Sequence, residues 1–125
     1  MTEKQIHSQI CNYLKLKYPK VIFNTDMSGI KLTIGQAVQA NKLRSNKGFP
    51  DICIYETSFD PFGYYSALFL EVKKESPYLK SGKLSTNKHI QEQNKVHQKL
   101  REKGYKVEFV WSLEDAIKLV DNYIN

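Results

Sequence analysis

The chain has 125 residues, of which 41% are hydrophobic and 26% are charged, and its formal net charge is +6. A chain of this length and composition is expected to form a single domain, residues 1–125, with a substantial hydrophobic core. No apolar run reaches the roughly 18 residues that a membrane-spanning helix needs, and the N-terminus lacks the pattern of a secretory signal. We therefore expect a cytoplasmic protein with no membrane partner.

The positive charge is concentrated in the second half of the chain. Between positions 73 and 106 there are ten Lys or Arg residues against three Asp or Glu residues. A second basic group consists of Lys42, Arg44 and Lys47. Clustered positive charge favours a polyanionic partner such as nucleic acid. Charge alone leaves open the alternative of a solvated helix surface that only keeps the protein in solution.

The first half of the chain predicts a helix, a short strand and a long polar connection. Thr2 and Gln5 form a capping-box pattern ahead of apolar residues at helical spacing, which predicts a helix over 3–17. The segment 20–25 is predicted to be a short strand. The polar stretch that follows is expected to be a connection with a short helix around 35–43.

The second half predicts a hairpin followed by a strand between two helices. Two apolar segments, 51–56 and 66–73, flank a turn rich in Pro, Gly and Asp and predict an antiparallel pair of strands. A helix is predicted over 86–103, a strand over 105–111, and a final helix capped by Ser112. A strand–helix–strand order implies a parallel crossover. We therefore predict the α/β (α+β) class, with a four-stranded mixed sheet flanked by helices.

Two acidic residues, Asp51 and Glu71, interrupt the apolar strands of the predicted hairpin. Side chains alternate along a strand, so Glu71 and Lys73 point to one face while Val72 points to the other. The start of the first strand lies beside the end of the second, which brings Asp51 next to this pair. Two close carboxylates repel each other unless a cation lies between them, and oxygen ligands suit Mg²⁺ or Mn²⁺. The pattern favours metal-assisted chemistry at a phosphate group over a solvent-facing Glu–Lys pair.

The motif Pro50-Asp51, with Glu71-Val72-Lys73 on the next strand, resembles the signature of the PD-(D/E)-x-K nuclease superfamily. The frame of residues after it resembles the corresponding run of the VRR-NUC (virus-type replication-repair nuclease) domains, namely Gly82, Ser85, Gln93, Leu100, Gly104 and Tyr105. Spacing to Leu100 favours Gln93 over Gln91 as the glutamine of that run. The resemblance covers nearly the whole chain. It implies a restriction-endonuclease-like core with the order α-β-β-β-α-β.

The resemblance implies a metal-dependent nuclease that hydrolyses phosphodiester bonds in DNA. Mg²⁺ or Mn²⁺ would be bound by Asp51, Glu71 and the backbone of Val72. Glu3, in the first turn of the first helix, would assist. The alternative for Glu3 is a purely structural role, since an acidic side chain at a helix N-terminus stabilises the helix.

Two further residues receive roles from the resemblance. Lys73 would stabilise the attacking water or the transition state, and Gln93 would support it. The structural alternative for Gln93 is an exposed helix residue. Glu75 would replace Glu71 as the acid if the register of the strand were different, although Glu71-Val72-Lys73 is the tighter match.

The resemblance also implies a kind of substrate and an assembly. Small members of this class, in bacteria or phage-infected cells, commonly act as homodimers on branched DNA. We therefore expect a structure-selective enzyme for Holliday-junction-like or flap substrates in replication or repair. The alternatives are a restriction- or homing-type endonuclease, for which no specificity domain is visible, and a noncatalytic nucleic-acid-binding module. Two acids close together would not help a protein that only binds nucleic acid. Their presence therefore argues against the noncatalytic module.

Basic residues in the segments around the motif are the predicted contacts to the phosphate backbone, which would position a duplex without reading its sequence. They are Lys42, Arg44, Lys47, Lys74, Lys80, Lys83 and Lys88. A solvated charge is an equal alternative for Lys74. His97 is expected to be a half-buried packing residue rather than a general base. Tyr64, Tyr65 and Tyr78 are candidates for stacking on bases, with local packing as the alternative.

Overall fold

The structure, a computed structural model, describes residues 1–26, 33–45 and 48–124. Its centre is a four-stranded sheet whose strands lie in the order β1-β2-β5-β6. These strands are β1 (Phe23–Thr25), β2 (Ile52–Ile54), β5 (Leu68–Val72) and β6 (Lys106–Val110). The first two pairs are antiparallel and the β5–β6 pair is parallel. The predicted mixed sheet, with its antiparallel pair and its parallel crossover, is confirmed.

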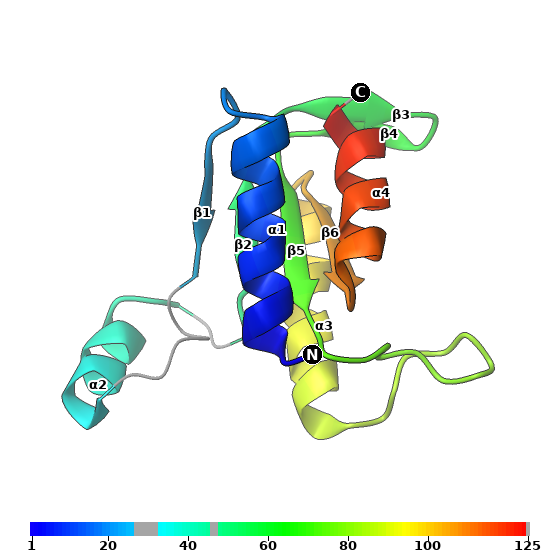
Figure 1. Cartoon of the computed structure of the whole chain (residues 1–125). Helices are drawn as coiled ribbons and strands as arrows, with labels where there is room; N and C mark the ends of the chain where they lie inside the picture. Colours follow the sequence, from blue (N-terminus) through cyan, green and yellow to red (C-terminus); the bar gives the residue numbers. More distant parts are fainter. Residues whose placement is uncertain (27–32, 46–47, 125) are drawn as a thin grey trace.

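Helices cover both faces of this sheet, as Figure 1 shows. α1 (Glu3–Lys17) and α4 (Leu113–Ile124) lie side by side on one face, and α3 (Lys88–Glu102) lies on the other. α1 begins with the predicted capping box of Thr2 and Gln5. α4 begins after Ser112, whose hydroxyl accepts a hydrogen bond of 3.1 Å from the backbone N–H of Asp115. Both predicted caps are therefore confirmed.

The main hydrophobic core lies between the sheet and the α1–α4 pair. Alternate residues of β5, namely Leu68, Leu70 and Val72, are buried in this core together with apolar residues of α1 and α4. The intervening residues Phe69 and Glu71 point to the opposite face, where α3 lies. The alternation that buries the core of β5 therefore also directs Glu71 toward α3.

The segment 57–65, predicted as a turn, forms a second two-stranded sheet. β3 (Ser58–Asp60) pairs antiparallel with β4 (Gly63–Tyr65). The Asp60 carboxylate accepts hydrogen bonds from the backbone N–H groups of Phe62 and Gly63 and closes the turn between them. The turn is thus shorter than predicted, because aromatic residues on both sides of it favour strands and one of them, Tyr65, packs against Tyr123 of α4.

α2 (Ile34–Lys42) confirms the short helix predicted around 35–43. None of its residues is buried. Figure 1 shows α2 and the loop 75–87 on opposite sides of the end of the sheet at which β5 finishes. None of the helices in the described parts of the chain is long and apolar enough to cross a membrane.

Candidate active site

Asp51 and Glu71 meet at the end of the sheet where β5 finishes. Asp51 directly precedes β2, and its backbone N–H donates a hydrogen bond of 2.9 Å to the carbonyl of Leu70. Its Oδ2 accepts a hydrogen bond of 2.7 Å from the backbone N–H of Val72. Because Glu71 lies between Leu70 and Val72 in the strand, the structure brings the two predicted acids together.

Glu71 is an acid in an environment that disfavours its charge. The residue is 2% exposed. Burial raises the pKa of its carboxyl to about 10, with a further increase from the charge of Asp51, while Lys73 acts in the opposite direction. The carboxyl is therefore neutral at pH 7 in the absence of a cation. Strongly shifted acids of this kind are concentrated at functional sites.

His97 of α3 is a site residue whose position contradicts the prediction made for it. Its side chain is entirely buried, and its Nε2 lies 2.9 Å from Oε1 of Glu71. Burial, aided by the charges of Arg101 and Lys73, lowers the pKa of its imidazole to about 4. The contact is thus a hydrogen bond between two neutral groups at pH 7 and not an ion pair. The predicted half-burial is wrong, because the side chain is fully buried, and His97 contacts the central acid in addition to its predicted packing role.

One signal in the sequence points to His97. Residues four positions apart share a face of a helix, and His97 stands four positions after Gln93. The face that carries Gln93 therefore also carries His97 toward Glu71. Its ring packs on Phe109 of β6, with 4.7 Å between the ring centroids, so packing accounts for only part of its surroundings. Its Nδ1 is buried and has no hydrogen-bond partner among the described residues.

Lys73 lies one residue beyond β5, beside Glu71. Its backbone N–H donates a hydrogen bond of 2.8 Å to the carbonyl of Val110, which extends the pairing with β6. The residue is only 9% exposed. Its ammonium forms no ion pair with the described carboxylates. A nearly buried cation without a counter-ion is costly, which favours an anion as its partner.

Gln93 is buried and does not lie on the surface. The residue is 7% exposed, and its Oε1 has no hydrogen-bond partner among the described residues. Gly48, with φ 81°, lies next to Gln93, and a Cβ there would be in van der Waals contact with it, 3.5 Å from its Cα. The segment that leads to Asp51 thus rests on Gln93. The alternative of an exposed glutamine is wrong, and Gln91 instead donates a hydrogen bond of 2.7 Å to the carbonyl of Ser85.

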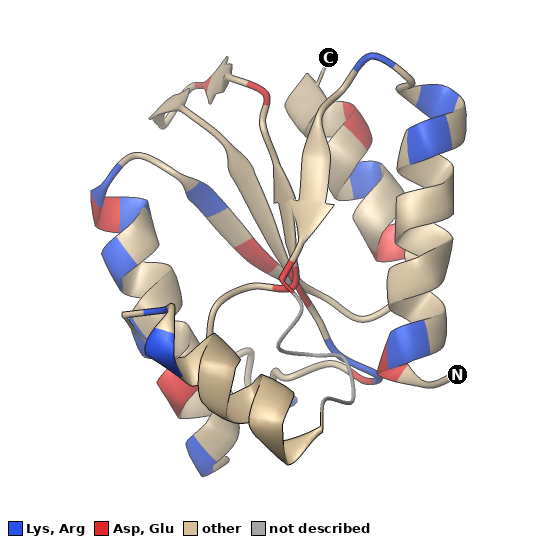
Figure 2. Ribbon diagram, turned by 90° about the vertical axis from the view of Figure 1, so that its left-hand side faces the viewer, with Lys and Arg blue, Asp and Glu red and all other residues tan. Residues whose placement is uncertain are grey.

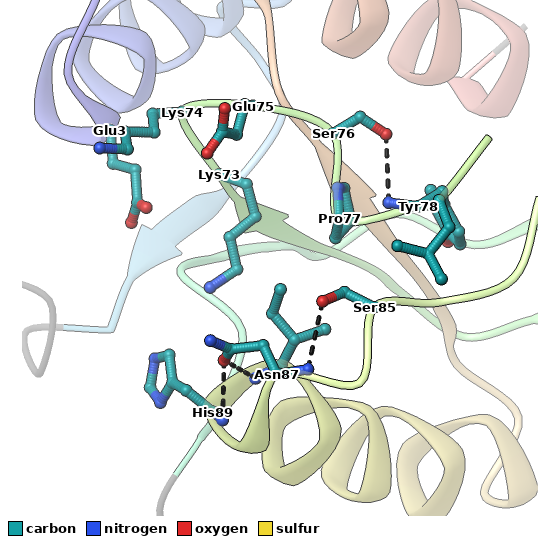
Figure 3. Close-up of a pocket in the computed structure, with 12 residues that line it drawn as sticks. Glu3, Lys73, Lys74, Glu75, Ser76, Pro77, Tyr78, Ser85, Asn87 and His89 are labelled. Carbon is teal, nitrogen blue, oxygen red and sulfur yellow. Dashed lines mark hydrogen bonds between the residues drawn. The ribbon is translucent and has the colours of Figure 1, made fainter.

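Glu3 lies in the first turn of α1, at the edge of a cleft that begins at Lys73 (Figure 3). Its charge is the smallest of the named effects that raise the pKa of Glu71. Within the described ranges, no three His, Cys, Asp or Glu side chains converge into a group that could hold a metal ion. Glu3 is therefore not grouped with Asp51 and Glu71 in the structure, and its predicted part in holding a metal stays a prediction.

The remaining donor set fits a hard divalent cation. Mg²⁺ usually takes one or two carboxylates and completes its shell with water and phosphate oxygens. Asp51 and Glu71 supply two carboxylates, and the mutual repulsion that raises the pKa of Glu71 is relieved when a cation lies between them. The pair therefore suits Mg²⁺ or Mn²⁺ without a third acid. Glu75, the alternative acid, is exposed in the loop after β5 and lines the cleft.

The predicted phosphate contacts lie on two sides of the site. Lys42 and Arg44 are at the end of α2, and Lys80, Lys83 and Lys88 belong to the opposite loop and the start of α3. Figure 2 shows Lys and Arg residues at the end of α2 and along α3. Arg44 is partly buried and donates a hydrogen bond of 2.5 Å to Asn41, whereas the other four are exposed. Lys47 lies outside the described residues.

Lys74 and the three tyrosines proposed to stack on bases lie in two different parts of the structure. Lys74 is exposed and lines the cleft beside Lys73, and Tyr78 lines the same cleft. Tyr64 and Tyr65 belong to the β3–β4 hairpin, which Figure 1 shows at the opposite end of the sheet from the site. Stacking on bases at the site is therefore open only to Tyr78.

Comparisons with known proteins support the fold. No protein-family model matches the chain, and no curated protein matches its sequence. The chain is similar to a solved structure described as "VRR_NUC domain protein", with a TM-score of 0.70 and 17% sequence identity over 99% of this chain and 88% of that one. Similarity at this level of identity concerns the fold. The chain therefore has the fold of a VRR_NUC domain protein, as its motifs predict.

Proposed function

We propose that the protein is a metal-dependent nuclease that hydrolyses phosphodiester bonds in DNA. The observation that carries the proposal is the buried carboxyl of Glu71, held beside Asp51 and raised to a pKa of about 10. Stability alone does not account for two acids in this place, whereas a site for a cation and a phosphate does. The VRR_NUC fold supports the same function.

Asp51 and Glu71 would hold Mg²⁺ or Mn²⁺, with the backbone of Val72 as a further ligand and Glu3 assisting from the edge of the cleft. A metal bound there supplies charge stabilisation at the phosphoryl oxygens and a more acidic water. With a cation between the two acids the carboxylate form of Glu71 would be favoured, and its proton would be released to solvent.

The other buried polar groups have roles in the same reaction. The unpaired ammonium of Lys73 donates to an oxygen of the scissile phosphate and stabilises the charge that develops on it. The unpartnered Oε1 of Gln93 accepts a hydrogen bond from the attacking water and orients it. His97 acts through Glu71 as a positioning residue, because its hydrogen bond holds one carboxyl oxygen and leaves the other for the metal.

The basic residues of α2 and of the loop 75–87 would hold the phosphate backbone on both sides of the site. Two separated basic surfaces suit a substrate with more than one arm, which favours branched DNA such as a flap or a Holliday-like junction. A homodimer, with one site for each strand, stays a prediction that sedimentation of the purified protein tests.

A cleavage assay tests the proposal. The purified protein is incubated with labelled flap, junction, duplex and single-stranded DNA in EDTA, Mg²⁺ or Mn²⁺. We expect cleavage only with metal, and its loss in Asp51→Asn. Glu114→Gln, which removes one exposed acid from α4, is the matched control and should cut normally. DNA binding without cleavage under any metal would mean a noncatalytic module.

A further inference from the structure

The cleft beside Lys73 is large enough for a ligand of its own. It has a volume of about 430 Å³ and lies between the loop after β5 and the first turn of α3. Figure 3 shows the side chain of Lys73 extending into it from the end of β5 toward Asn87. Pockets of about 300 to 1,000 Å³ hold small molecules, and such a volume admits one nucleotide but not a duplex.

The wall formed by the start of α3 presents hydrogen-bond donors to the cleft. Oδ1 of Asn87 accepts hydrogen bonds from the backbone N–H groups of His89 and Ile90, at 2.9 and 3.2 Å. Oγ of Ser85 accepts one of 3.1 Å from the backbone N–H of Asn87. The backbone thus occupies the acceptor oxygens, and the amide protons of Asn87 and the hydroxyl proton of Ser85 are left for a ligand.

This wall and Lys73 together favour an anion. A nearly buried ammonium without an ion pair faces neutral donors, and phosphate oxygens accept from groups of both kinds. Glu3 and Glu75 also line the cleft, and Figure 3 draws them on the side of α1 and β5. Their two negative charges outnumber the one positive charge of Lys74 on that side, which makes the Asn87 wall the better place for a phosphate.

The far end of the cleft is apolar, and its aromatic ring is held in place by neighbouring rings. It is lined by Pro77, Tyr78 and Leu79 of the loop. The ring of Tyr78 makes edge-to-face contacts with Phe109 and Trp111, with centroid distances of 6.2 and 5.9 Å. Its position is therefore fixed by β6 and the residue after it, although it is 38% exposed. A fixed aromatic ring beside apolar side chains is a surface on which a base packs.

We propose that this cleft binds one unpaired nucleotide of the substrate, with its phosphate on Lys73, Ser85 and Asn87 and its base against Tyr78 and Leu79. The inference rests on the proposed function for its place in the reaction, since Lys73 also serves the scissile phosphate. An unpaired nucleotide beside that phosphate makes a flap or a free strand end a better substrate than an intact duplex.

Binding of small probes tests the cleft without any metal. Thymidine 5′-monophosphate, thymidine and inorganic phosphate are titrated into the full chain in EDTA, and the Asn87 side-chain amide is followed by ¹H–¹⁵N NMR. We expect the nucleotide to bind at least about tenfold more tightly than either fragment, as one charge-assisted hydrogen bond alone is worth that much. Equal binding of thymidine would overturn the phosphate assignment, and equal binding of inorganic phosphate would overturn the base contact.

Asn87→Asp separates the ligand contact from the fold. Asp also caps helices, so the first turn of α3 is retained, but the amide donors are replaced by an anionic oxygen. We expect about a tenfold or greater loss of nucleotide affinity. Asn122→Asp, the same change at an exposed position of α4, should bind as the unchanged chain does. Equal nucleotide affinities of all three proteins, or an equal loss of affinity in both variants, would refute the assignment of the cleft as the nucleotide site.

The same variants separate this inference from the nuclease proposal. The protein could bind the nucleotide, lose this binding in Asn87→Asp, and yet cut no DNA. That result would support the nucleotide site and refute the nuclease proposal. Cleavage in which Asn87→Asp keeps the flap-to-duplex rate ratio of the unchanged chain would support the nuclease and refute the cleft. Loss of that ratio, with duplex cleavage retained, is the result we expect.

Discussion

Asp121 and Glu71 are two acids in different surroundings. Asp121 lies at the contact between two helices and Glu71 lies in the sheet, and their surroundings shift their pKa in opposite directions. Asp121 of α4 accepts hydrogen bonds of 2.6 and 2.7 Å from the hydroxyls of Tyr18 and Tyr13, and Lys17 pairs with it at 3.0 Å. The hydrogen bond of Tyr18, followed by that of Tyr13, lowers the pKa of its carboxyl. These contacts join α4 to α1 and stabilise the fold.

Glu71 has the opposite surroundings. It is buried against a second acid, and burial raises the pKa of its carboxyl to about 10. His97 hydrogen-bonds its carboxyl, and Lys73 makes no ion pair with the described carboxylates. An acid surrounded by donors stabilises the fold, whereas an acid crowded by another acid needs a bound cation to become charged. The difference indicates which end of the sheet carries the chemistry.

The two lysines beside these acids provide the largest expected contrast. Lys73→Met keeps the apolar stem but removes the ammonium, and we expect the single-turnover cleavage rate to fall about 100-fold, as for other groups that stabilise transition-state charge. Lys17→Met removes the partner of Asp121 and should leave the rate unchanged. Equal rates for Lys73→Met and the unchanged chain would remove Lys73 from the proposed site.

His97→Phe tests whether the only histidine in contact with Glu71 among the described residues positions it. Phenylalanine fills a similar volume but cannot hydrogen-bond the carboxyl, so we expect Mn²⁺ affinity, measured by electron paramagnetic resonance, to fall about tenfold to 100-fold. Val96→Ala, a buried change on the same helix, should reduce stability and leave Mn²⁺ affinity intact. An unchanged affinity in His97→Phe would reduce the histidine to a packing role.

Glu71→Gln is expected to stabilise the metal-free protein at pH 8. The pKa of Glu71 lies above its ordinary value of 4.5, so the unfolded chain releases this proton while the folded chain keeps it, and stability falls as the pH rises from 4.5 toward 10. Glutamine does not titrate. We expect its free energy of unfolding in EDTA, measured with urea, to exceed that of the unchanged chain by at least about 1.4 kcal/mol, the equivalent of one pKa unit. At pH 4 the two proteins should be nearly equal.

Asp121→Asn should show the opposite sign and the smallest effect. The pKa of Asp121 is lowered, so its stabilisation is present above its ordinary value of 3.8 and is lost as the pH falls through the folded-state pKa. We expect the variant to be about 1 kcal/mol less stable at pH 8, the usual net contribution of one hydrogen bond, because the asparagine oxygen still accepts from a tyrosine. The difference in the free energy of unfolding should become smaller near pH 2. The DNA cleavage rate at pH 8 should be unaffected. A stabilising effect at pH 8 would contradict the comparison.

Local rules explain how much of the site could be predicted. Strand alternation and the pairing of consecutive strands bring Asp51, Glu71 and Lys73 together, and both are visible in the sequence as period-two patterns around a turn. The β3–β4 hairpin was not predicted. A segment rich in Pro, Gly and Asp has the same composition whether it is one long turn or a short turn between two short strands. Glu3 illustrates another limit, since its distance from the acids depends on how α1 packs on the sheet.

Local periodicity and strand pairing are enough to predict the elements of the central sheet and its covering helices, the mixed sheet and the end of β5 at which the acids gather. Packing in three dimensions brings His97 of α3 to Glu71, 26 positions earlier in the chain, buries Gln93 against Gly48, and places Asn87 on the same cleft as Lys73. The rotation of α3 on the sheet sets all three contacts. That rotation is set by the packing of whole faces and not by any residue alone.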